Sequence, residues 1–239
     1  MSKPPKIDRK ELRHPDEFQK KGTVFVELLA SNKNHLLLLA VGIVVILLGS
    51  YGYNVWDDHR IEKAWNAYYK AGKAGEKEKW EEYKKVFTEH KGTRAALFAS
   101  TTVADHYFEE AKKSVLKDVN ANPPETATAI EWYNHALEYN GLLPQEKQLI
   151  TINKGNAVEL SKNYDEAMKL YQGAADGGGN VKGYALLNVA RVLELKNDKA
   201  KAMETYEKVS TDFLNTEYAK MAKNSLRRMK NTSLSNLNL

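Results

Sequence analysis

Histidine side chains are the residues of this chain best suited to hold a metal ion or to transfer a proton near neutral pH. The sequence of 239 residues contains six of them and no cysteine. They are His14, His35, His59, His90, His106 and His135. No two are four residues apart, the spacing that places two metal ligands on one face of a helix. The pattern predicts no metal centre, and the absence of cysteine excludes disulfides and cysteine nucleophiles.

Two other patterns resemble parts of enzyme active sites. Glu81 and Glu82 are adjacent, so on a helix their carboxylates point in different directions and cannot act together as acid and base. The run from Gly177 to Gly179 lacks the Lys-Ser/Thr pair that follows the glycines of a phosphate-binding loop. We predict that the chain is not an enzyme and needs no cofactor. The alternative is an enzyme whose active site cannot be recognised from sequence motifs.

The charge balance argues against a nucleic-acid partner. Lys and Arg number 36 against 31 Asp and Glu, which gives a net charge of +5 and a pI of about 9.0. Eight of the basic and five of the acidic residues lie within the first 33 positions, so the rest of the chain carries 28 against 26. A domain with this balance has no basic stripe that could follow a phosphate backbone.

One apolar segment near the N-terminus has the length of a membrane span. Residues 34–56 contain no Asp, Glu, Lys or Arg over 23 positions. As a helix this segment covers about 34 Å, and the hydrocarbon core of a bilayer is about 30 Å thick. Tyr51, Tyr53 and Trp56 gather at its far end, where aromatic rings favour the lipid–water interface. We predict a single transmembrane helix at 34–56; a cleaved signal peptide or a buried core helix is the alternative.

The flanks of this segment suggest an orientation. Residues 1–33 form a short basic tail, and long domains cross membranes largely regardless of their charge. We therefore expect the tail in the cytoplasm and the following domain on the other side. Thr23–Ser31 is apolar enough to form a short helix on the membrane surface, or else it extends the transmembrane helix.

From residue 57 onward the sequence has the spacing of helices almost to its end. Apolar residues recur every three or four positions, and turn residues divide the chain into about nine helical segments. A period of 35 residues relates some of them, because Ala167 recurs as Ala202 and Tyr171 as Tyr206. Small residues such as Gly155 would let two antiparallel helices approach closely, with a tyrosine filling the space one turn later.

This period resembles the tetratricopeptide repeat, most specifically over Gln148–Asp176 and Gly183–Asn215. The resemblance is weaker upstream of these two units. The resemblance implies an α-solenoid of helix pairs, and together with the apolar segment at 34–56 it predicts an all-α fold with one N-terminal transmembrane helix before the solenoid. The repeat domain would span residues 57–230, with the helix Thr216–Lys230 covering its last pair. Residues 231–239 would form a flexible C-terminal tail.

In stacked helix pairs, the first helices line a concave groove that suits an extended peptide or a partner helix. Gly155 and Val158 would face the paired helix, so an adjoining face would line the groove, and the next unit would continue it. The candidate partner-binding residues on these faces are Leu149, Ile152, Asn156, Glu159, Tyr184, Leu187, Arg191 and Glu194. Ordinary packing is the alternative for the apolar members of this set, and for Asn156 and Arg191 a contact between helices is equally open.

The whole layout, a short basic tail, one anchor and then a repeat domain, resembles the ancillary Sec translocon subunit family of the bacterial inner membrane. The resemblance implies a single-pass protein with a periplasmic repeat domain. It implies an interaction scaffold that assists translocation or chaperone hand-over, with the translocation channel, chaperones or exported polypeptides as partners. An anchored receptor or assembly scaffold that faces the cytosol is the alternative, and homo-oligomers are compatible with the sequence.

Overall fold

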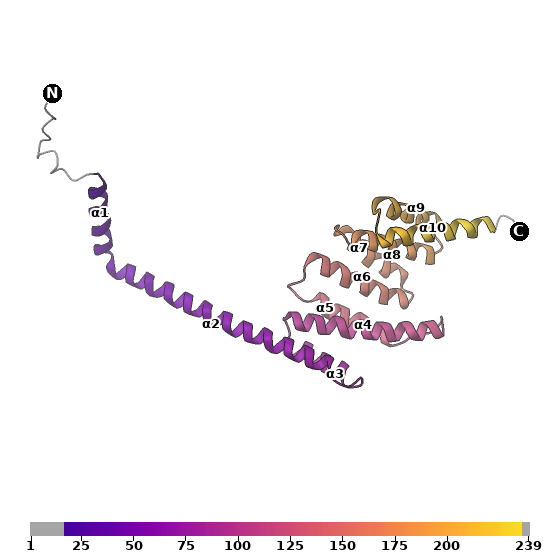
Figure 1. The fold of residues 1–239 in the computed structure, drawn as a ribbon, viewed down its shortest axis with the longest axis horizontal. Helices are drawn as coiled ribbons and strands as arrows, with labels where there is room; N and C mark the ends of the chain where they lie inside the picture. The colour runs from indigo at the N-terminus through magenta and orange to yellow at the C-terminus, as the bar shows by residue number, and fades with distance from the viewer. Residues whose placement is uncertain (1–16, 236–239) are drawn as a thin grey trace, which may run out of the picture. The chain divides into compact units, whose positions relative to one another are not determined.

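The computed structural model describes residues 17–235, and its regular structure in that range consists of helices alone (Figure 1). This confirms the all-α prediction. The chain divides into two units, residues 1–59 and residues 60–239, with the boundary inside α2. The helices are α1 (Glu17–Ser31), α2 (Lys33–Gly72), α3 (Lys79–Glu89), α4 (Arg94–Lys117), α5 (Glu125–Leu137), α6 (Pro144–Leu160), α7 (Tyr164–Asp176), α8 (Lys182–Leu195), α9 (Lys199–Asp212) and α10 (Glu217–Ser235).

The helix α2 contains the predicted apolar segment and continues beyond it. It runs for 40 residues, and one part of it is long and apolar enough to cross a membrane. Residues 57–72, which follow the predicted span, belong to this same helix. Asp57 and Asp58 make the helix surface polar but supply no turn residue, so nothing ends the helix there.

A separate helix, α1, precedes α2. It begins at Glu17, earlier than the predicted Thr23–Ser31, and Asn32 alone separates it from α2. The Asn32 Nδ2 group donates to the Leu28 carbonyl oxygen at 3.0 Å, a local bond that competes with regular helix hydrogen bonds. Of the two alternatives for this stretch, the structure has the separate helix. Residues 1–16 of the predicted basic tail lie outside the described residues.

Helices of the second unit pack in chain order. Each helix from α3 to α10 contacts the next one, so that α4 with α5, α6 with α7 and α8 with α9 form consecutive hairpins (Figure 1). The first helices α4 and α6 of neighbouring hairpins also touch, as do α8 and the last helix α10. Within residues 60–235 the second helices α5, α7 and α9 make no comparable contact with one another. The first helices therefore line the inner side of the stack.

The cores of the hairpins follow the predicted period. Ala167 and Tyr171 of α7 are fully buried in one cluster, and Ala202 and Tyr206 of α9 occupy the same places in the next. A Cβ atom on Gly155 of α6 would come within 2.6 Å of the Tyr171 ring, so the two helices meet at this glycine. The small-residue and tyrosine register predicted from the sequence is confirmed.

The last helix covers the end of the stack. Ala222, Leu226 and Met229 of α10 are buried in the same cluster as Ala202 of α9. The helix ends at Ser235, so residues 231–235 of the predicted flexible tail are helical. Residues 236–239 lie outside the described part of the chain.

Candidate functional site

A hollow of about 450 Å³ lies on the inner side of the stack. We call it the groove. It is lined from α4, α6, α8, α9 and α10, and its main residues are Phe108, Lys112, Asn156, Glu159, Tyr184, Arg191 and Met221. Ligand sites in proteins have volumes of roughly 300–1,000 Å³, so the groove is large enough for several side chains of a bound chain.

Five of the eight predicted binding residues line the groove. They are Asn156, Glu159, Tyr184, Leu187 and Arg191. Leu187 is only 6% exposed, so it packs the floor of the groove and offers little surface. The sequence did not single out Phe108, Lys112 or Met221, because they lie in helices that match the repeat poorly or end it.

The other three predicted residues lie elsewhere. Ile152 is fully buried in the core shared with α7, so its assignment to the groove is wrong. Neighbouring helices cover α6 on more than one side. Ile152 therefore packs inward and does not face the groove. Leu149 is 45% exposed but does not line the groove. Glu194 lies outside the lining and is engaged by neighbouring helices.

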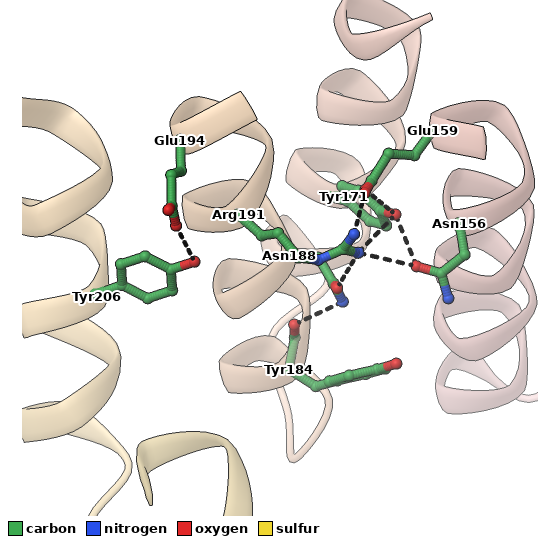
Figure 2. Close-up of polar contacts among 8 residues, drawn as sticks. All are labelled: Asn156, Glu159, Tyr171, Tyr184, Asn188, Arg191, Glu194 and Tyr206. Atoms are coloured by element: carbon green, nitrogen blue, oxygen red, sulfur yellow. Dashed lines mark hydrogen bonds and ion pairs between the residues drawn. The ribbon is translucent and has the colours of Figure 1, made fainter. Parts of the chain in front are cut away.

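Arg191 of α8 is the centre of a polar network between consecutive hairpins (Figure 2). Its guanidinium group forms an ion pair with the Glu159 carboxylate of α6 and donates to Asn188 Oδ1 at 2.8 Å. A longer bond of 3.4 Å reaches Asn156 Oδ1. The Tyr171 hydroxyl of α7 lies 2.7 Å from Asn156 Oδ1 and 3.0 Å from Glu159 Oε2, so its single hydrogen is shared between these two acceptors. The network therefore joins α6, α7 and α8.

Burial dominates the electrostatics of this network. The Glu159 side chain is only 10% exposed, and loss of water raises its pKa, although Arg191 and Tyr171 act in the opposite direction. Burial and the neighbouring Glu159 carboxylate raise the pKa of Tyr171, so this phenol stays protonated and donates. The sequence leaves open whether Asn156 and Arg191 bind a partner or tie helices together. In the structure both take part in contacts that hold the hairpins together.

The same arrangement recurs one hairpin further along. Figure 2 shows the Tyr206 hydroxyl of α9 pointing to Glu194 of α8, which accepts its hydrogen bond at 3.4 Å. The Glu194 carboxylate also binds Arg228 of α10 through two parallel bonds of 2.6 and 2.8 Å. These bonds lower the pKa of Glu194. Glu194 lies 35 positions after Glu159, and Tyr206 lies 35 positions after Tyr171. The same acid and tyrosine therefore recur in two consecutive hairpins.

A third pair of this kind lies in the first hairpin. The Tyr133 hydroxyl of α5 donates to Asp105 Oδ1 of α4 at 2.5 Å. We call Asp105–Tyr133, Glu159–Tyr171 and Glu194–Tyr206 the acid–tyrosine pairs. Asp105 differs from the other two acids, because no cation among the described residues forms an ion pair with it. Asp105 is exposed to solvent, and partial loss of water beside the neighbouring helices raises its pKa above the usual value.

A second hollow, of about 290 Å³, lies among the ends of α3, α4 and α5. Phe87, Leu97 and Tyr139 contribute apolar walls, and His135 lies at its edge. The ring nitrogens of His135 are 3.9 and 3.7 Å from neighbouring carboxylates, too far for good hydrogen bonds. Among the described side chains, no group of three or more His, Asp or Glu could hold a metal ion.

Sequence comparison adds no relative. No protein-family model matches the chain, and no curated protein matches it significantly. The tetratricopeptide resemblance therefore rests on the repeat spacing of this sequence, and the translocon resemblance rests on the layout of its segments.

Proposed function

We propose that this chain is a membrane-anchored scaffold that binds polypeptides in the groove of a tetratricopeptide-repeat solenoid. The observation that carries the proposal is the groove itself, because its lining combines apolar side chains with hydrogen-bonding groups. Phe108 and Met221 offer apolar contact, while Lys112 and Tyr184 offer polar contact. An extended polypeptide presents the same mixture of side chains and backbone groups.

The repeat geometry supports the solenoid part of the proposal. Three hairpins carry the same acid–tyrosine pair, and two of them repeat the core alanine and tyrosine at a 35-residue offset. Each hairpin buries its apolar face against its neighbours, as expected for stacked repeats. In a stack of this kind the inner surface has a fixed curvature, so it holds a binding groove open.

The anchor part of the proposal rests on α2. Its apolar part is long enough to span a membrane, and basic residues precede it. We place the protein in the bacterial inner membrane, with residues 1–33 in the cytoplasm and the repeat domain in the periplasm. Tethering raises the local concentration of the groove near polypeptides that emerge from a membrane channel, so weak contacts suffice. The translocation channel, periplasmic chaperones and exported polypeptides are the proposed partners.

Site-specific photo-crosslinking in cells tests this function. A photoreactive residue at Met221, which is 54% exposed and lines the groove, should crosslink to translocation-channel subunits, chaperones or exported chains. The matched control places the same residue at Lys208, on the outer helix α9. Adducts that are the same at both positions, or none at Met221, contradict the groove as the binding surface. Adducts with cytosolic proteins alone would favour the receptor or assembly scaffold that faces the cytosol.

A further inference from the structure

The three acid–tyrosine pairs differ in one respect. Glu159 is paired with Arg191 of α8, and Glu194 with Arg228 of α10. Arg191 comes from the first helix of the following hairpin, and Arg228 comes from the helix α10 that covers the last hairpin. Asp105 has the tyrosine donor but no arginine among the described residues. A cation is therefore missing beside one of the three acids that accept a hydrogen bond from a tyrosine of their own hairpin.

The sequence explains why α6 does not supply this cation. Counting back 35 residues from Arg191 leads to Asn156, the corresponding position on α6. An asparagine side chain is uncharged and shorter than an arginine. The Oδ1 atom of Asn156 already accepts bonds from Tyr171 and Arg191. The Asn156 side chain is therefore engaged by α7 and α8, and it supplies no cation to Asp105.

Asp105 is also placed where a bound chain could reach it. It lies one turn before Phe108 and two turns before Lys112 on the same face of α4, and both of those residues line the groove. Lys112 is held by Glu109 at 2.8 Å, so it is not available to Asp105. Part of the Asp105 side chain is open to solvent.

We infer that Asp105 is a binding site for an arginine or lysine side chain of the polypeptide held in the groove. This inference rests on the proposed function and specifies its substrate class: chains with a basic residue next to apolar ones. The incoming cation would take the place that Arg191 and Arg228 take at the other two acids. An arginine suits this place best, because its planar guanidinium group matches a carboxylate through two parallel bonds, as Arg228 shows with Glu194.

Binding of two matched peptides to the full chain in nanodiscs of zwitterionic lipid tests the inference. One fluorescein-labelled peptide alternates leucine and arginine, and its twin carries the uncharged isostere citrulline in place of each arginine. Fluorescence anisotropy gives both dissociation constants, with empty nanodiscs as the background. The wild-type chain should bind the arginine peptide roughly fivefold more tightly than its twin, the scale of one partly exposed ion pair.

Substitution of Asp105 identifies the group responsible. Asp105→Asn should remove the preference for the arginine peptide, whereas it keeps an acceptor for Tyr133 and so keeps the fold. Its thermal midpoint checks that the domain is intact. Glu131→Gln is the matched control, because it removes the same charge from an exposed side chain of α5. The preference should survive in that variant.

A second variant tests the missing arginine directly. Asn156→Arg places an arginine on α6 at the position 35 residues before Arg191, so its guanidinium group should pair with Asp105 and lower the affinity for the arginine peptide. Equal binding of both peptides to the wild type, or an unchanged preference in Asp105→Asn, would overturn the inference and leave the groove function standing. Failure of both peptides to bind the wild type would count against the groove function as well.

Discussion

The Glu159 carboxylate on α6 and the Arg191 guanidinium group on α8 form an ion pair that joins two consecutive hairpins (Figure 2). The pair is asymmetric, since the Glu159 side chain is 10% exposed and that of Arg191 is 42% exposed. Glutamate therefore loses most of its water on folding and depends on the arginine to replace it. The ion pair holds the stack together, and both of its residues also line the groove.

Removal of Arg191 should destabilise the domain. Arg191→Ala leaves the Glu159 charge buried without a cation, and we expect a loss of about 1–3 kcal/mol in the free energy of unfolding. Chemical denaturation of the wild type and the variant measures this loss. Lys196→Ala is the control, because its partner Asp165 is 78% exposed and such pairs contribute at most about 1 kcal/mol. Equal effects of the two substitutions would show that the Arg191 network does not hold the hairpins together.

The close approach of α6 and α7 at Gly155 gives a second prediction. A Cβ atom there would lie 2.6 Å from the Tyr171 ring, which is fully buried and cannot move away. Gly155→Ala should therefore lower the stability by about 1–3 kcal/mol. Gly173 lies inside the helix α7 with open space around it, so Gly173→Ala should stabilise by up to about 1 kcal/mol. Thermal or denaturant unfolding of the two variants should thus show changes of opposite sign.

The pKa of Asp105 gives a prediction about pH. Burial raises its folded pKa above the usual 3.8, so the ionised form disfavours the folded state. The contribution of Asp105 to the free energy of unfolding is therefore fully present when the pH is below the pKa of Asp105 in the unfolded chain. This contribution is lost as the pH rises through the pKa of Asp105 in the folded domain. Asp105→Asn should therefore gain stability relative to the wild type at pH 7, and the gain should disappear on acidification to about pH 3.8. Thermal midpoints of both proteins across this range measure the difference, and a constant offset would contradict it.

The sequence predicted the repeated contacts better than the single ones. The alanine and tyrosine positions recur at a fixed offset of 35, so the register of two hairpins followed from counting. The ion pair between Glu159 and Arg191 could not be predicted in the same way, because it depends on how two hairpins stack. The Asp105–Tyr133 pair escaped notice because the connection between α4 and α5 is longer, which breaks the offset.

The spacing of apolar and polar residues did not predict every side-chain position correctly. Ile152 and Asn156 were placed on one stripe of α6, yet the first is buried and the second lines the groove. A helix that packs against several neighbours has more than one apolar face, and periodicity alone does not tell them apart. At Asp57 the side chains become polar while the backbone stays helical, so the change of polarity does not mark the end of the helix.

The membrane orientation can be tested without background, because the chain has no cysteine. Ser2→Cys and Lys208→Cys place single thiols on either side of the predicted span, the second on an exposed face of α9. If the repeat domain is periplasmic, a membrane-impermeant maleimide should label Lys208→Cys in cells with a permeabilised outer membrane. It should label Ser2→Cys only after lysis. The reverse pattern would place the domain in the cytosol. If α2 instead belongs to a cleaved signal sequence, the mature product would lack the thiol at position 2, and Lys208→Cys would appear in the soluble fraction.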